Sequence, residues 1–145
     1  MKVKDVMMGT PYYCQLDTNL GSATELMWIG NCGFLPVMGD DGKIVGVITD
    51  RDLCCSLMAD GLDPNTTTIE KFMTLNPVTC REEEDVESCE RLMQEHQIRR
   101  IPVVNAEDSV IGIVAQADLA LKDKSERVSK TVAEISKPAD PSAAA

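Results

Sequence analysis

Aromatic residues, histidine and long apolar runs are scarce in this chain, and each shortage excludes a kind of protein. Aromatic residues make up 3% of the 145 residues, and His96 is the single histidine. The six cysteines form no C-x-x-C pair, so the short Cys/His spacing of a zinc site is missing. No apolar run approaches the ~20 residues of a transmembrane helix, and the first residues lack the apolar region of a secretory signal. We therefore expect a cytoplasmic protein with reduced thiols, no metal and no membrane partner.

Basic residues are outnumbered as well. The chain has 14 lysines and arginines against 24 aspartates and glutamates, and its formal net charge is −10. An acidic chain repels nucleic acid at long range, so nucleic acid is not an expected partner. A small anionic ligand would need a local group of basic side chains. No Ser/His/Asp or Cys/His set can be assembled from the sequence, so we expect no enzyme activity.

The sequence is dominated by an internal repeat. Residues 3–53 align without a gap with residues 69–119, and such a register indicates two copies of one structural unit. The identical pairs include Pro36-Val37 with Pro102-Val103, Gly46 with Gly112, and Asp52-Leu53 with Asp118-Leu119. Two similar small units usually share a core with pseudo-two-fold symmetry, and any cleft between them then comes as a related pair.

Each copy reads as β-α-β-β-α, which predicts a mixed α/β (α+β) fold with sheets flanked by helices. In copy one we expect strands at 12–16, 34–38 and 43–49, a helix that follows a cap at 17–18 and is closed at 31–33, and a second helix at 50–59. Asp17-Thr18 is the predicted cap of the first helix, and Leu20, Ala23 and Met27 form its buried face. In copy two we expect strands at 78–81, 101–104 and 110–115. There the acidic run 82–85 is predicted to open a helix, and residues 116–121 begin the last one.

These elements suggest a division of the chain. We assign 1–59 to the first unit, 60–68 to a linker, 69–121 to the second unit, 122–136 to an amphipathic helix and 137–145 to a disordered tail. Val128, Val132 and Ile135 form the apolar stripe of that helix, and Trp28 is expected in a core or an interface. Because Trp28 and this stripe lack an obvious internal partner, we predict a homodimer.

The segment 46–53 is the strongest candidate for a binding site, because a buried strand runs directly into a helix. Thr49 can offer a hydroxyl and Arg51 a fork of donors to phosphate, and Asp52 can accept from the two hydroxyls of a ribose. Thr49 and Asp52 also fit a capping box, which needs no ligand. In copy two the hydroxyl is replaced by Ala115, while Asp118 is kept and Arg100 precedes the strand. We predict one cleft with Thr49, Arg51 and Asp52, and another with Arg100 and Asp118.

The doubled pattern of a short helix ending in Met, G-x-x-P-V, and G-h-h-T-x-x-D-L resembles a tandem pair of CBS domains. The matching segments are 3–7, 33–37 and 46–53, and in copy two 69–73, 99–103 and 112–119. The pattern departs from the family at Phe34, where copy two has Arg100, and at Ala115, where copy one has Thr49. The chain is similar to small proteins that contain little beyond such a pair.

This resemblance implies two clefts that bind AMP, ADP, ATP or a related adenosyl ligand, with no obligatory cofactor. Thr49, Asp52 and Asp118 would hold ribose, and Arg100 would meet phosphate. The candidates for the adenine pocket are Cys14, Pro36, Val37, Cys80, Pro102 and Val103. The resemblance also implies a homodimer with a regulatory, energy-sensing role toward a separate enzyme or transporter. The alternative is a structural CBS pair whose clefts bind no nucleotide.

Overall fold

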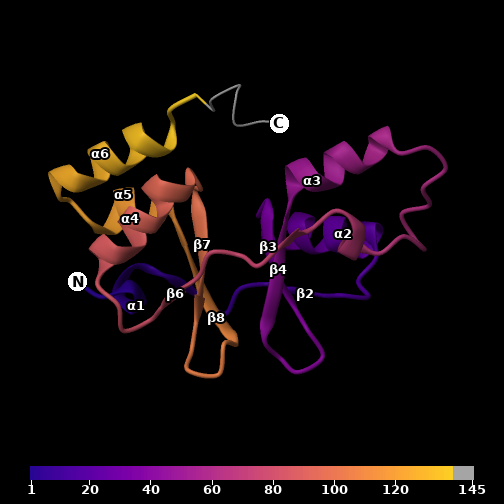
Figure 1. The fold of residues 1–145 in the computed structure, drawn as a ribbon, viewed down its shortest axis with the longest axis horizontal. Coiled ribbons are helices and arrows are strands. Elements are labelled where there is room, and N and C mark those ends of the chain that lie inside the picture. Colours follow the sequence, from indigo (N-terminus) through magenta and orange to yellow (C-terminus); the bar gives the residue numbers. More distant parts are fainter. Residues whose placement is uncertain (139–145) are drawn as a thin grey trace.

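The computed structural model describes residues 1–138, which form two repeats lying side by side (Figure 1). The first repeat contains α1 (Val3–Val6), β1 (Met8–Gly9), β2 (Cys14–Gln15), α2 (Leu20–Gly30), β3 (Phe34–Met38), β4 (Ile44–Thr49), α3 (Asp50–Cys55) and the 3-10 turn η1 (Ser56–Met58). The second contains η2 (Ile69–Lys71), β5 (Thr74–Leu75), β6 (Cys80–Arg81), α4 (Val86–His96), β7 (Arg100–Val104), β8 (Val110–Ala115), α5 (Gln116–Lys122) and α6 (Glu126–Ile135). This arrangement confirms the predicted mixed fold. Most of the tail predicted to be disordered lies outside the described residues.

The two repeats exchange their leading segments. One sheet has the order β1-β8-β7-β6 and the other β2-β3-β4-β5, so each sheet takes an edge strand from the other repeat. The cores follow the same exchange: Val3 and Val6 of α1 are buried in the core of the second repeat, and Ile69 in the core of the first. Figure 1 shows α1 beside α4 and α5. The boundaries 1–59 and 69–121 follow the sequence repeat, whereas packing joins each leading segment to the opposite copy.

Glycines make this exchange possible where β5 joins β4 and β1 joins β8. Gly46 lies opposite Leu75, and a methyl group on Gly46 would stand 2.7 Å from the carbonyl oxygen of Thr74. Gly112 lies opposite Gly9 in the equivalent pair. The edge strands β1 and β5 are two residues long and absent from the sequence prediction. Their partners lie far along the chain, so no local pattern marks them.

The central hairpins β3–β4 and β7–β8 agree with the prediction and separate two faces. Leu35, Val37 and Ile48 are fully buried beneath the helices of the first repeat. Because side chains alternate along a strand, Phe34 and Thr49, which are paired across the hairpin, point to the opposite face. That opposite face is available for a site.

Two predicted helix starts are wrong. The acidic run 82–85 lies in the turn before α4, which begins at Val86, and Lys2 pairs with Asp85 at 2.8 Å. These carboxylates therefore pair with lysines of the N-terminal segment instead of lying in the first turn of a helix. The cap of α2 is Asn19, whose side chain accepts from the N–H of Ser22 at 2.7 Å, and not Asp17-Thr18. The helix expected at 50–59 ends at Cys55 and continues as η1.

The stripe on α6 has an internal partner, so this part of the reasoning for a homodimer is wrong. Val128 and Ile135 belong to the core of the second repeat and are 7% and 5% exposed. Trp28 is instead 86% exposed and lies in no core. The contact between α6 and α4 was not predicted from the sequence, because the face of α4 that α6 covers is polar.

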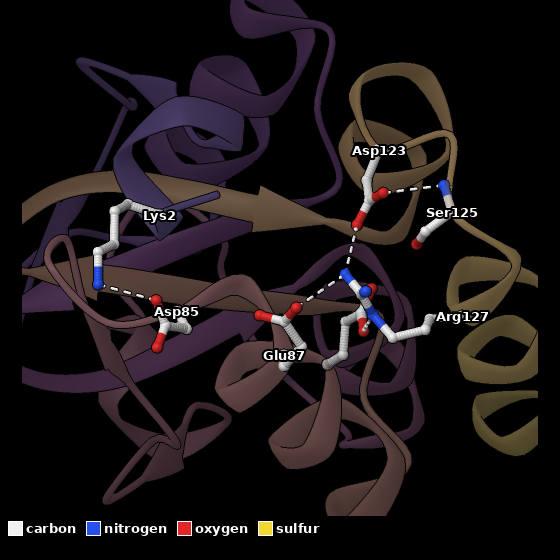
Figure 2. Close-up of polar contacts among 7 residues, drawn as sticks. Lys2, Asp85, Glu87, Asp123, Ser125 and Arg127 are labelled. Atoms are coloured by element: carbon white, nitrogen blue, oxygen red, sulfur yellow. Dashed lines mark hydrogen bonds and ion pairs between the residues drawn. The ribbon is translucent and has the colours of Figure 1, made fainter.

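An arginine of α6 forms ion pairs with this face of α4 and with the residue that follows α5. Arg127 forms ion pairs with Glu87, Glu90 and Asp123 at 3.0, 3.4 and 3.2 Å, and Figure 2 shows it between Glu87 and Asp123. Burial raises the pKa of Glu90, although Arg127 opposes the shift. The hydrogen bond from the N–H of Ser125 lowers the pKa of Asp123.

Candidate functional site

A hollow of about 620 Å³ lies between the two repeats. It is lined by the face of β3–β4 that points away from the helices, the start of α3, the segment after β5, and the chain that enters β7. Its lining residues are Phe34, Val47, Thr49, Asp50, Arg51, Thr74, Asn76, Pro77, Val78, Gln97, Ile98, Arg99, Arg100 and Pro102. This volume falls in the range of small-molecule sites. Because both repeats supply its walls, the hollow depends on their relative placement.

Three arginines converge on this hollow in a chain of net charge −10. Arg51 comes from the first repeat, and Arg99 and Arg100 come from the second. Within residues 1–138 none of the three takes part in an ion pair. Guanidinium groups bind phosphate oxygens through paired, charge-assisted hydrogen bonds. The hollow is therefore a local basic site of the kind that an anionic ligand requires.

Asp50 is the acidic member of the lining, and its position is held by its neighbours. The N–H of Asp50 donates to the carbonyl of Gly33 at 2.9 Å, and its carboxylate accepts from the N–H of Arg51 at 2.9 Å. Gly33 lies so close to this carboxylate that a methyl group would collide with it. Copy two has Arg99 at the position of Gly33, so the two repeats present different charges at equivalent points.

Asp52 and Asp118 hold the starts of their helices. Asp52 accepts from the N–H of Thr49 at 2.9 Å, and the Thr49 hydroxyl accepts from the N–H of Asp52 at 3.2 Å. Asp118 accepts from the N–H of Ala115 at 2.8 Å, which preserves half of the capping box. Asp118 therefore keeps a structural role at the start of α5 although the hydroxyl is replaced by Ala115. Each of these bonds uses one carboxylate oxygen.

The predicted site residues are grouped differently from the expectation. Thr49, Arg51, Arg100 and Pro102 line the same hollow, whereas we had placed Arg100 in the other cleft with Asp118. The reason is that the start of β7 lies beside the end of β4 from the other repeat.

The remaining candidates for the adenine pocket do not line this hollow. Cys14 and Val37 lie in the core of the first repeat, and Cys80 and Val103 in that of the second. Their strands turn these side chains toward the helices. Pro36 is paired with Val47, which does line the hollow. Burial raises the pKa of Cys14 to about 11, so this thiol is a core residue of low reactivity.

Sequence reasoning missed much of the lining. Arg99 directly precedes Arg100 and could have been included on that ground. Phe34 and Val47 could have been found from strand alternation. Asn76 and Gln97 also line the hollow. Both have φ values of 50° and adopt the left-handed conformation, which no local sequence pattern predicted.

Among residues 1–138, no group of three or more His, Cys, Asp or Glu side chains could hold a metal ion. Within the same range, every helix is too short or too polar to cross a membrane.

Comparison with known proteins agrees with this architecture. The family model "CBS domain" matches residues 3–58 and 69–124, so the chain belongs to the CBS-domain family as a tandem pair. A relative from Bacillus subtilis, the uncharacterized protein YlbB, is 37% identical over 137 residues, covering 93% of this chain and 91% of the relative.

Two solved structures carry adenosine ligands. The CBS domain pair of protein MJ0100, in complex with 5-methylthioadenosine and S-adenosyl-L-methionine, is 30% identical with a TM-score of 0.74, and the match covers 83% of this chain and 94% of that one. CBSX2 in complex with AMP is 26% identical with a TM-score of 0.70, and the match covers 94% and 98% of the two chains. Both are similar to this chain over most of its length.

Proposed function

We propose that this chain is a non-enzymatic regulatory module that binds an adenosine nucleotide in the hollow between its repeats. The main observation behind this proposal is that Arg51, Arg99 and Arg100 converge on a hollow of about 620 Å³ in an otherwise acidic protein. Among residues 1–138 these arginines have no ion-pair partners. Complexes of related CBS pairs with AMP and with adenosyl compounds support the ligand class. The arginines favour a ligand that carries phosphate.

The lining suggests a role for each part of the ligand. The three arginines would take the phosphate. Asp52 is not one of the lining residues, so a ribose contact would need its second oxygen to reach the ligand while the first keeps the helix cap. Phe34, Val47 and Pro102 offer an apolar surface to adenine. Asp118 and the other adenine candidates remain a proposal for a second cleft.

Titration calorimetry tests the phosphate contact directly. AMP and 5′-methylthioadenosine share adenine and the ribose diol and differ at the 5′ position, where one has a phosphate and the other an uncharged methylthio group, so they separate the two parts of the site. We expect Arg99→Ala with Arg100→Ala to weaken AMP by roughly tenfold to a hundredfold, since a hydrogen bond to a charged group is worth about 1.5–3 kcal/mol. Methylthioadenosine should change little. Arg91→Ala is the matched control, because Arg91 lies on α4 outside the hollow.

The aspartates give a second test. If Asp52 and Asp118 hold ribose, Asp→Asn at each should lower affinity for AMP and for methylthioadenosine alike, roughly tenfold or more. If they only cap helices, the same changes should alter stability by well under about 1 kcal/mol and leave binding intact. A double Asp→Asn protein that binds AMP as tightly as the wild type would remove the ribose role.

A structural CBS pair without a ligand is the second candidate, and the capping bonds favour it. The hydrogen bonds at Thr49 and Ala115 explain both aspartates without a nucleotide. Thermal melting separates the candidates, because a ligand at a hundredfold excess over its Kd adds about 2.7 kcal/mol to the free energy of unfolding. An unchanged Tm in millimolar AMP, ADP and ATP would favour the structural candidate.

We also propose a cellular location, a target and an oligomeric state for this module. The free cysteines suit the reducing cytoplasm. A module of this kind would act on a separate enzyme or transporter and report the energy state of the cell. The exposed Trp28 supports a homodimer.

A further inference from the structure

Gln97 connects the hollow between the repeats to the last helix of the chain. It directly follows α4, it lines the hollow, and its side-chain amide donates to the carbonyl oxygens of Glu134 and Lys137 at 3.5 and 3.4 Å. Glu134 lies in the last turn of α6, and Lys137 lies just beyond the helix. Both hydrogen bonds are long, so each is weak. One side chain therefore contacts the end of α6 and also forms part of the wall of the proposed nucleotide site.

The wall of the hollow continues from Gln97 to the two arginines of the second repeat. Ile98, Arg99 and Arg100 are the next residues of the lining, and the N–H of Ile98 donates to the carbonyl of Met93 on α4 at 3.1 Å. The same carbonyl accepts from the N–H of Gln97, whose φ is 50°. The end of α4 thus sets the backbone of the segment that carries both arginines.

The first half of α6 is held on the same helix by polar contacts (Figure 2). Arg127 pairs with Glu87 and Glu90 of α4 and with Asp123, and α6 packs against both α4 and α5. Glu90 is buried, and its Oε1 atom has no hydrogen-bond partner among residues 1–138. Because removing charges from water costs about as much as their attraction returns, such a pair adds little net stability. The polar contacts therefore position α6 without locking it in place.

We propose that the docking of α6 and the binding of a ligand in the hollow are coupled. Docked α6 holds Gln97, and through it the segment with Arg99 and Arg100, in the arrangement that meets phosphate. A ligand on this segment in turn favours docked α6, since coupling between two sites is reciprocal. This coupling rests on the proposed function and gives the module an output, because release of α6 uncovers the acidic face of α4 with Glu87 and Glu90.

A charge reversal on α6 tests the coupling from outside the hollow. Arg127→Asp places a fourth carboxylate among the three that Arg127 pairs with, and should release the helix. Lys130→Asp is the matched control, because it makes the same change of charge at an exposed position of α6, and Lys130 has no ion-pair partner among residues 1–138. Neither residue lines the hollow.

Titration calorimetry measures the effect of both variants on affinity. We expect Arg127→Asp to weaken AMP about fivefold, at the lower end of typical coupling because the hydrogen bonds from Gln97 are long. Lys130→Asp should change the affinity for AMP by less than about twofold, since an exposed charge is screened by salt. The affinity of Arg127→Asp for 5′-methylthioadenosine, which carries no phosphate, should fall less than its affinity for AMP.

Gln97→Gly separates the coupling from other effects of α6. Glycine adopts the φ of 50° without strain and removes the amide. If the amide carries the coupling, Arg127→Asp should no longer weaken AMP when it is combined with Gln97→Gly, so the effects of the two changes should not add. A full fivefold loss in the double variant would exclude Gln97 as the connection.

Hydrogen exchange of the wild-type chain gives the reciprocal measurement, and it decides alone if Arg127→Asp does not fold or does not release α6. Saturating AMP should slow exchange of the α6 amides about fivefold in the wild type and leave them unchanged in Gln97→Gly. AMP that binds the wild type without slowing α6, or that binds Arg127→Asp as tightly while α6 exchanges faster, overturns the coupling and leaves the proposed function standing. If AMP does not bind the wild type, the proposed function fails as well.

Discussion

The exchange of edge strands depends on close backbone approach at Gly46, and a graded series of alanine substitutions tests it. A methyl group on Gly46 would stand 2.7 Å from the carbonyl oxygen of Thr74 and 3.1 Å from the sulfur of Met73. The carbonyl belongs to β5 and cannot rotate away, so β5 must separate from β4. Overpacking of this kind costs about 1–3 kcal/mol, and we expect Gly46→Ala near the upper end. For a chain of this size, about 3 kcal/mol lowers Tm by roughly 6–12 °C.

Alanine substitutions at two other glycines serve as comparisons for the loss of stability expected in Gly46→Ala. At Gly112 a methyl group would lie 2.6 Å from the flexible sulfur of Met7 and 3.0 Å from the carbonyl oxygen of Met8, so Gly112→Ala should cost about 1–2 kcal/mol. At Gly9 nothing lies within 4 Å, and Gly9→Ala should change stability by less than about 0.5 kcal/mol. Melting curves by circular dichroism measure all three. Equal losses at the three positions, or the largest loss at Gly9, would refute the reasoning.

Other expectations concern α6 and the thiols. Arg127→Ala leaves the buried Glu90 carboxylate without its counter-ion and should destabilise the fold by about 2 kcal/mol in urea titration; no loss would mean that α6 is held by its apolar stripe alone. Because the pKa of Glu90 is raised in the folded protein, stability falls as pH rises from the ordinary range of a glutamate through the raised value. Glu90→Gln should therefore gain stability relative to the wild type between pH 4.5 and 7, and a constant difference would contradict this. In dilute protein, Cys54 and Cys55 should react with a disulfide reagent at once, and Cys14 only after unfolding; rapid reaction of Cys14 would contradict its burial.

The parts of the fold that were predicted correctly are those with a local physical signal. Alternation and turns marked both central hairpins, and the capping box at Thr49 marked the start of α3. The cap at Asn19 was misplaced by one or two residues because several neighbouring side chains could serve. The docking of α6 was missed because Glu90 and Gln94 resemble solvent-exposed residues until Arg127 and Thr131 are placed against them.

The candidate site was only partly predictable, for a related reason. Thr49, Arg51 and Arg100 were chosen because their side chains can donate hydrogen bonds to phosphate, and all three line the hollow. Which residues share a cleft depends on how the repeats pack, and the repeat alignment does not contain that information. Arg100 was therefore predicted in the cleft of Asp118, whereas the structure places it in the lining of the hollow with Thr49 and Arg51.

The exchange of leading segments makes the two halves of the chain mutually dependent as units of folding. Residues 1–59 without the second half would expose Val3 and Val6 and leave β4 without its edge partner; the second half would miss α1 and β1. Neither sequence repeat is thus a domain that could be cut out, duplicated alone or transplanted. If the chain were severed in the exposed stretch 63–66, each fragment would still carry a piece of the other's core and sheet. The two fragments would then reassemble as complementary parts of one cooperative structure.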